Sequence, residues 1–341
     1  MSARFTAALL SGALWLAMAA DAQEFQNPVP STVSPEAQAF LRNLPDPATY
    51  PKLPAAADIE AWRKLKSQEA ARSESKVLAT LARYEPAIES RMSNGVPVLD
   101  VKPRGWRQSP GIIVFIHGGG YVLGSARSSL PASVPLATDA GLRLISIDYT
   151  TIPFATYDEI LQQIIAVVLD LKRAGHALAS IGVVGVSAGG GLAAGSALKM
   201  RDDGIGMPAA MVLWSPAADL AERGETFVTL REFEPAFDYR EVEKISGLVV
   251  PQDRLRAPYV SPVYGDFTRG YSPTLIQGGT REILLSNFVR LYQAMDAGGV
   301  SVKLDLYEGM VHTFQEVAPD LPESALARAK SVRFLLTHIS R

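Results

Sequence analysis

Seven segments of the chain are short, mostly apolar and rich in β-branched residues, and runs such as residues 111–116 and 181–186 have no polar face. We predict each of them to be a strand. They cover residues 98–101, 111–116, 142–147, 181–186, 210–214, 273–277 and 302–307. Apolar residues at helical spacing separate several of these segments and predict helices over residues 157–174, 188–201, 283–297 and 322–338.

Strands without a polar face are typical of a parallel sheet that helices cover on both sides. Their alternation with helices predicts an α/β fold with a doubly wound, mostly parallel sheet. Residues 217–271 interrupt this alternation with a long stretch of mixed charge and many aromatic side chains. We interpret that stretch as a cap insertion, packed with a helical segment over residues 58–82.

The N-terminus has the layout of a secretory signal peptide, because Arg4 precedes an apolar run over residues 5–20 and Ala20-Asp21-Ala22 forms an A-x-A cleavage site. We predict a signal peptide over residues 1–22 and a secreted or periplasmic protein that starts near Gln23. The alternative is an uncleaved N-terminal anchor. We expect an arm and cap helices over residues 23–96, and a catalytic domain over residues 97–341.

The amino-acid composition excludes several kinds of catalytic site and partner. The 341 residues include no Cys, four His, and 33 Lys and Arg against 35 Asp and Glu. Disulfides, zinc–thiolate sites and cysteine nucleophiles are therefore excluded. The near-balanced charge gives no reason to expect nucleic acid, which requires a concentrated basic surface. We expect no cofactor, no metal and no stable membrane insertion of the mature chain; the sequence does not indicate the oligomeric state.

A serine lies at the junction between a predicted buried strand and a helix, in the pattern Gly185-Val186-Ser187-Ala188-Gly189. G-x-S-x-G at such a junction exposes the hydroxyl on a sharp, strained turn, and the glycines let neighbouring backbone approach. The alternative is a serine that caps an ordinary turn. We interpret Ser187 as a nucleophile.

A serine nucleophile needs a base, and only four histidines are available. His338 lies on the last predicted helix, His176 follows a helix end, and His117 precedes three glycines. His312 lies in a loop after the last predicted strand, where no structural role explains it. We therefore predict His312 as the base.

The base needs an acid to orient its imidazole, and that acid should follow a strand between Ser187 and His312 in the chain. Glu282 satisfies this condition, because it comes just after the strand predicted over residues 273–277. A carboxylate that interacts with a helix dipole is the alternative reading of Glu282. Asp305 is the second candidate for the acid, although it lies within a strand.

Three glycines, Gly118, Gly119 and Gly120, follow the strand predicted over residues 111–116. A glycine run presents backbone N–H groups without side-chain obstruction, as stabilisation of an oxyanion requires. We predict these residues and the N–H of Ala188 as the oxyanion hole.

The same glycines imitate a dinucleotide-binding fingerprint, because Gly124 follows them and Asp148 ends the next strand. The segment after the glycines contains Pro131 and Pro135, and we expect no clean helix there to receive a pyrophosphate. A dinucleotide site would also leave Ser187 and His312 unexplained.

Three motifs in this order resemble the hormone-sensitive-lipase-like esterases of the α/β-hydrolase superfamily: His117-Gly-Gly-Gly120, Gly185-x-Ser187-Ala-Gly189-Gly and Gly309-Met-x-His312-x-Phe314. The resemblance runs from about residue 98 to residue 338. It implies an eight-stranded, mostly parallel sheet, a helical cap, and hydrolysis of short- to medium-chain carboxylic esters. It implies Ser187, Glu282 and His312 as the triad, with the glycine run and Ala188 as oxyanion donors.

The chain departs from that family in three places. Val186 replaces a frequent Asp, and Glu282 replaces the more common Asp as the acid. After Asp148 and Tyr149, which we interpret as supports of the glycine turn, Thr150-Thr-Ile-Pro-Phe154 replaces the usual Arg-Leu-Ala-Pro-Glu. The last departure affects the wall beside the oxyanion hole.

The sequence thus predicts a secreted serine carboxylesterase that works through an acyl-enzyme. Cleavage of amides or peptides by the same triad, and binding of a small ligand without catalysis on the same fold, are the alternatives. Five aromatic residues are candidates for the substrate pocket, with core packing as the alternative for each: Tyr121, Trp214, Phe227, Phe233 and Phe237.

Overall fold

The computed structural model describes residues 29–46, 52–235 and 238–340. The predicted signal peptide, residues 1–22, lies outside the described residues, as does Phe237. Cleavage and secretion therefore stay predictions.

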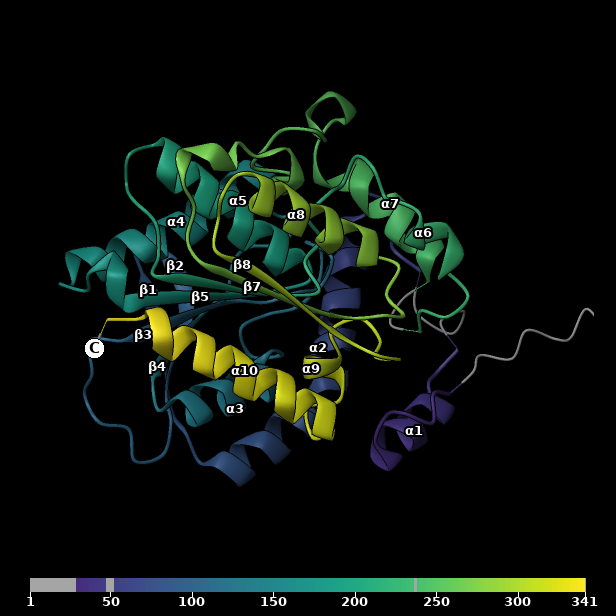
Figure 1. The fold of residues 1–341 in the computed structure, drawn as a ribbon, viewed down its shortest axis with the longest axis horizontal. Coiled ribbons are helices and arrows are strands. Elements are labelled where there is room, and N and C mark those ends of the chain that lie inside the picture. The colour runs from purple at the N-terminus through teal and green to yellow at the C-terminus, as the bar shows by residue number, and fades with distance from the viewer. Residues whose placement is uncertain (1–28, 47–51, 236–237, 341) are drawn as a thin grey trace, which may run out of the picture.

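One eight-stranded sheet forms the centre of the molecule, in the order β1-β2-β4-β3-β5-β6-β7-β8 (Figure 1). Strands β1 and β2, and β2 and β4, pair antiparallel, whereas all later pairs are parallel. The predicted α/β class with a mostly parallel sheet is confirmed. The strands are β1 (Ala87–Ser93), β2 (Val96–Lys102), β3 (Ile112–Ile116), β4 (Arg143–Ile147), β5 (Ile181–Val186), β6 (Ala210–Trp214), β7 (Thr274–Gly279) and β8 (Val302–Tyr307).

Helices cover both faces of this sheet, as the missing polar face of the strands requires. On one face lie α4 (Tyr157–Arg173), α5 (Ala188–Asp202) and α8 (Leu285–Ala297) (Figure 1). On the other lie α3 (Leu130–Ala140) and α10 (Pro322–His338). Strand β3 shows why both faces are apolar, because alternate residues of it belong to two separate hydrophobic cores.

The predicted cap combines two segments that are far apart in the chain. Its N-terminal part is α2 (Ile59–Tyr84), which begins at the N-cap Asp58 and buries Trp62 and Leu65. The insertion after β6 contributes α6 (Thr226–Thr229) and α7 (Tyr239–Val249), which lie beside each other in Figure 1. The remaining short elements are α1 (Pro35–Arg42), α9 (Phe314–Val317) and 3-10 turns at Leu178–Ser180, Gln252–Arg254, Pro262–Tyr264 and Phe267–Arg269.

Strand β1 is an element that the hydrophobic pattern does not predict. It is an edge strand, mostly exposed, and it joins β2 through Asn94 and Gly95. Both turn residues have positive φ, 49° and 83°, as a tight hairpin turn requires. The sheet therefore begins before residue 97, where we predict the catalytic domain to start; the division into domains itself stays a prediction.

Helix α3 corrects the expectation that no clean helix follows the glycine run. Pro131 lies in the first turn of α3, where no backbone N–H is needed. Pro135 lies inside the helix, and the helix continues past it to Ala140. The helix begins only at Leu130, well after Gly120, so it does not place its N-terminus directly at the glycines.

Candidate active site

Ser187 lies on the turn between β5 and α5, in a strained backbone conformation with φ 53° and ψ −119°. Backbone hydrogen bonds fix the turn. The N–H of Ser187 donates to Trp214 O at 2.8 Å, and the carbonyl of Ser187 accepts the N–H groups of Gly190 and Ala217. A Cβ on Gly189 would lie 2.2 Å from Ile116 O, so glycine is required where α5 meets the end of β3. The surrounding structure thus enforces the strain and fixes the position of the hydroxyl.

His312 connects the serine to the acid. Its Nε2 lies 2.8 Å from Ser187 Oγ, and its Nδ1 lies 2.8 Å from Glu282 Oε2. The imidazole is 4% exposed, and Glu282 is fully buried. The three residues form a continuous hydrogen-bonded chain, which is the arrangement that proton transfer away from a serine requires.

The second carboxylate oxygen of Glu282 is also held. The hydroxyl of Ser215 donates to Glu282 Oε1 at 2.8 Å, and the N–H of Gly279 donates to the same oxygen. Ser215 Oγ accepts in turn from the N–H of Thr313, at 3.1 Å, directly after the base. A buried carboxylate with hydrogen bonds on both oxygens is stabilised as an anion and cannot rotate away from the imidazole.

The charge of Glu282 sets the protonation of His312. Burial alone would lower the pKa of His312, but the hydrogen bond and negative charge of Glu282 act against burial. The charges of Glu234 and Glu316 add to this effect, and the pKa of His312 is raised above its ordinary value. An imidazole with a raised pKa is a stronger base toward the serine hydroxyl.

The remaining histidines have local partners. His176 Nδ1 lies 3.3 Å from Pro110 O, and His338 Nδ1 lies 2.9 Å from Phe334 O. Burial lowers the pKa of His117 to about 4, so this ring stays neutral at physiological pH.

Asp305, the second candidate for the acid, is held elsewhere in the structure. Its carboxylate accepts from Lys330, Gln277 and Tyr307 beside β8. The structure thus places Glu282, and not Asp305, on the imidazole.

The glycine turn lies against the nucleophile. A Cβ on Gly118 would lie 3.2 Å from the Cβ of Ser187, and one on Gly119 would lie 2.3 Å from Leu123 O. Within the described part of the chain, the N–H groups of Gly118, Gly119, Gly120 and Ala188 donate no hydrogen bond. These residues therefore offer the free backbone donors that an oxyanion requires.

Tyr149 and Asp148 support this turn, as we expected. The ring of Tyr149 stacks on His117, with centroids 4.1 Å apart, and its hydroxyl donates to His117 O at 3.0 Å. Asp148 accepts from the N–H of Ala126 at 2.9 Å. Both residues therefore act on the backbone that carries the glycines, away from the reacting atoms.

A cavity of about 500 Å³ opens above the serine. Its wall is mostly apolar and comes from the cap and the loops at the carboxyl ends of the strands. Tyr121 and Phe227 are among its lining residues. Trp214 is not; it is fully buried, packs edge-on against Phe115 and donates to Ser331, so it belongs to the core.

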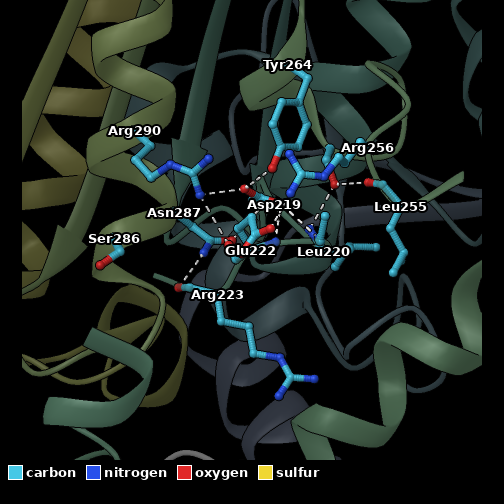
Figure 2. Close-up of polar contacts among 12 residues, drawn as sticks. Asp219, Leu220, Glu222, Arg223, Leu255, Arg256, Tyr264, Ser286, Asn287 and Arg290 are labelled. Carbon is cyan, nitrogen blue, oxygen red and sulfur yellow. Dashed lines mark hydrogen bonds and ion pairs between the residues drawn. The ribbon is translucent and has the colours of Figure 1, made fainter. Parts of the chain in front are cut away.

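One wall of the cavity is a loop that α8 holds in place through a buried carboxylate (Figure 2). Asp219 accepts from Arg290 at 2.6 Å and from Tyr264 at 3.1 Å, and its other oxygen accepts the N–H groups of Ala221 and Glu222. Asn287 accepts the N–H of Asp219. Helix α8 begins at Leu285, three residues after Glu282, so the acid and the residues that anchor this wall are close together in the chain.

Comparisons with known proteins agree with this geometry. A family model described as the alpha/beta hydrolase fold matches residues 113–316, more than half of the chain. An acetyl-hydrolase of Streptomyces hygroscopicus is 32% identical over 263 residues, which are 74% of this chain and 88% of that protein. The chain belongs to the α/β-hydrolase family.

Two solved structures of esterases are similar to this α/β hydrolase over most of its length. An esterase from the bacterial hormone-sensitive lipase family is 28% identical, with a TM-score of 0.79 over 90% of this chain and 99% of that chain. The esterase E25 is 26% identical, with a TM-score of 0.81 over 92% and 97%. The predicted membership among hormone-sensitive-lipase-like esterases and the predicted enzyme class, a carboxylesterase, are confirmed.

In the described ranges of this α/β hydrolase, no cluster of three or more His, Asp or Glu residues is suited to hold a metal ion. No helix of the same ranges is long and apolar enough to span a membrane.

Ser215, which holds the acid, and Asp219, which holds the cavity wall, are site residues that no motif in the sequence predicts. Both follow β6 directly, in Ser215-Pro216-Ala217-Ala218-Asp219. Their position at the carboxyl end of a central parallel strand is a signal for site residues, because ligands bind at that edge of such a sheet. Ser215 also has a positive φ of 48°, which sequence does not reveal.

We predict that Ser215→Ala lowers kcat about 10- to 100-fold, the effect of losing one hydrogen bond to a charged group, with little change in KM. The hydroxyl contacts Glu282 and no substrate, so ground-state binding should be preserved. Steady-state kinetics on a p-nitrophenyl ester measures the changes in kcat and KM separately.

Ser215→Gly separates the hydroxyl from the backbone, because glycine adopts a positive φ without strain. We expect this variant to unfold at a temperature no lower than Ser215→Ala while losing the same activity. Full activity in Ser215→Gly would show that the hydroxyl does not position the acid.

The pH profile should report the raised pKa of His312. The neutral imidazole is the active form, so kcat/KM should fall as the pH drops, with a midpoint above the ordinary 6.5 of histidine. In Glu282→Gln the main cause of the raised pKa is gone. We expect its midpoint at lower pH and its kcat reduced about 10³- to 10⁴-fold. An unchanged midpoint in the variant would contradict this account.

Proposed function

We propose that this α/β hydrolase cleaves carboxylic esters through an acyl-enzyme. Ser187 Oγ attacks the ester carbonyl while His312 Nε2 accepts its proton, and the oxygen of the tetrahedral intermediate binds the free N–H groups of the glycine turn and Ala188. His312 then donates the proton to the leaving alcohol. Water, deprotonated by the same nitrogen, releases the acid and restores the serine.

A single observation carries the proposal: the unbroken chain of hydrogen bonds from Ser187 through His312 to Glu282, next to unpaired backbone donors. A non-catalytic ligand-binding protein does not need this geometry, because a histidine held between a serine hydroxyl and a carboxylate is the arrangement that activates a serine nucleophile. The names of the relatives, acetyl-hydrolase and esterase, support the same reaction.

The cavity supports small esters as substrates. About 500 Å³ within a mostly apolar wall accommodates a short- to medium-chain acyl group and its alcohol. We therefore propose soluble esters of that size as the substrate class.

We predict that Ser187→Ala loses about 10⁶-fold in kcat on p-nitrophenyl butyrate, because the triad acts as a unit. The purified variant should keep the thermal unfolding temperature of the wild type. Hydrolysis retained by the folded variant would exclude Ser187 as the nucleophile.

A matched p-nitroanilide of the same acyl group distinguishes esters from amides. We expect the ester to react at a far higher kcat/KM, because the anilide nitrogen is a poorer leaving group. Equal rates would favour the amidase alternative. Stoichiometric labelling of the wild type, but not of Ser187→Ala, by an organophosphonate would argue against a protein that only binds a ligand.

We also propose that the protein is exported, because Arg4, the apolar run over residues 5–20 and the Ala20-Asp21-Ala22 cleavage site together have the layout of a signal peptide. Expression of the full sequence in a bacterial host should give a periplasmic or extracellular protein whose N-terminus, by intact mass, lies near Gln23. An intact Met1 on membrane-bound protein would instead favour the retained anchor.

A further inference from the structure

The active-site cavity has one charged lining residue that stands apart from the others. Among the described residues that line the cavity, seven besides His312 are charged, and six of these seven form ion pairs with neighbouring side chains. These pairs are Glu69 with Arg72, Asp219 with Arg290, Arg223 with Glu243, Asp238 with Arg240, and Glu241 with Lys244. The seventh residue is Glu316.

Glu316 lies on α9, four residues after the base, with its N–H bonded to Thr313 O at 2.7 Å. Within the described ranges, its carboxylate has no hydrogen bond and no ion pair. The side chain is partly buried, and it lines the cavity. A carboxylate in mostly apolar surroundings without a partner is costly, and a ligand that supplies the partner removes that cost.

The charged groups around Glu316 leave it without a counter-ion. Lys76 of α2 acts on it from beyond ion-pair distance, and the Lys76 ammonium donates to Val317 O at 3.4 Å instead. Glu69 and Arg72, on the same helix, neutralise each other. His312 is bound to Glu282, and Tyr149 stays protonated because burial raises its pKa well above the ordinary value.

The proton path of the reaction indicates which part of the substrate meets Glu316. His312 Nε2 must reach the oxygen of the leaving alcohol to protonate it, so the alcohol lies on the His312 side of the ester. Glu316 lies four residues after His312, lines the same cavity and acts electrostatically on its imidazole. The carboxylate is therefore next to the space that the alcohol occupies.

We propose that Glu316 is a specificity-determining residue that selects esters whose alcohol carries a positive charge. The inference rests on the proposed ester hydrolysis and adds the chemical class of the alcohol. A cation a few atoms from the ester oxygen supplies the partner that Glu316 lacks, while the apolar wall contacts the carbon atoms around the charge.

The test compares two esters of the same shape, butyrylcholine and 3,3-dimethylbutyl butyrate, which differ in a quaternary nitrogen against a carbon. The measured quantity is the ratio of their kcat/KM values, charged over neutral. We expect Glu316→Gln to lower this ratio about tenfold, the size of one partly screened charge contact. Glu308→Gln is the matched control, because Glu308 is an exposed acid that accepts from Thr32 and does not line the cavity; it should leave the ratio unchanged.

The wild type alone provides a second readout, which does not depend on the folding of any variant. Burial raises the pKa of Glu316 to about 7. The carboxylate is the form that attracts the cation, so the ratio should rise as the pH increases through about 7. The titration of His312 affects both esters alike and cancels in the ratio. In Glu316→Gln the ratio should not change with pH.

Each outcome is decisive. An equal ratio in the wild type and Glu316→Gln, a ratio independent of pH in the wild type, or an equal fall in Glu308→Gln would overturn the role of Glu316 while leaving the ester hydrolase intact. Failure of the wild type to hydrolyse either ester would overturn the proposed function itself, and this inference with it.

Discussion

The buried carboxylate of Glu282 is the interaction on which the active site depends. It is fully shielded from solvent, and both oxygens are occupied: one by His312, the other by Ser215 and the N–H of Gly279. An unpartnered charge at this depth would be strongly unfavourable, so the three segments that supply these donors must come together for the chain to fold. The geometry required for stability is therefore the geometry required for proton transfer.

Three residues with a strained backbone lie around the same point. Ser187, Ser215 and Thr313 are not glycines, yet all three have φ near +50°. Ser187 belongs to the triad, Ser215 donates to Glu282, and Thr313 follows His312 in the chain and donates its N–H to Ser215. The regular sheet, with its two apolar cores, supplies the stability that holds these residues in conformations they would otherwise avoid.

Much of the fold could be predicted because the central strands are buried on both faces, which removes the polar alternation from their sequences. The prediction fails where that reason does not hold. Strand β1 is exposed and has no such run; the only local signal is its Asn94-Gly95 turn, which is typical of a hairpin. Helix α3 contains Pro135, and packing of its buried residues between the sheet and α2 outweighs the lost backbone hydrogen bond.

The sequence alone determined the chemistry that is local or scarce: a serine on a glycine-flanked turn, a glycine run after a strand, and a histidine chosen from four. The first two signals are motifs of a few consecutive residues, and the third depends on the small number of histidines in the chain. Only the tertiary structure decided which carboxylates have partners, because those contacts join distant parts of the chain. Ser215 and Glu282 are 67 residues apart, and Asp219 and Arg290 are 71 apart. Glu316 is distinguished in the same way, since only the folded cavity shows that the six other charged residues lining it are paired, while Glu316 has no partner among the described residues.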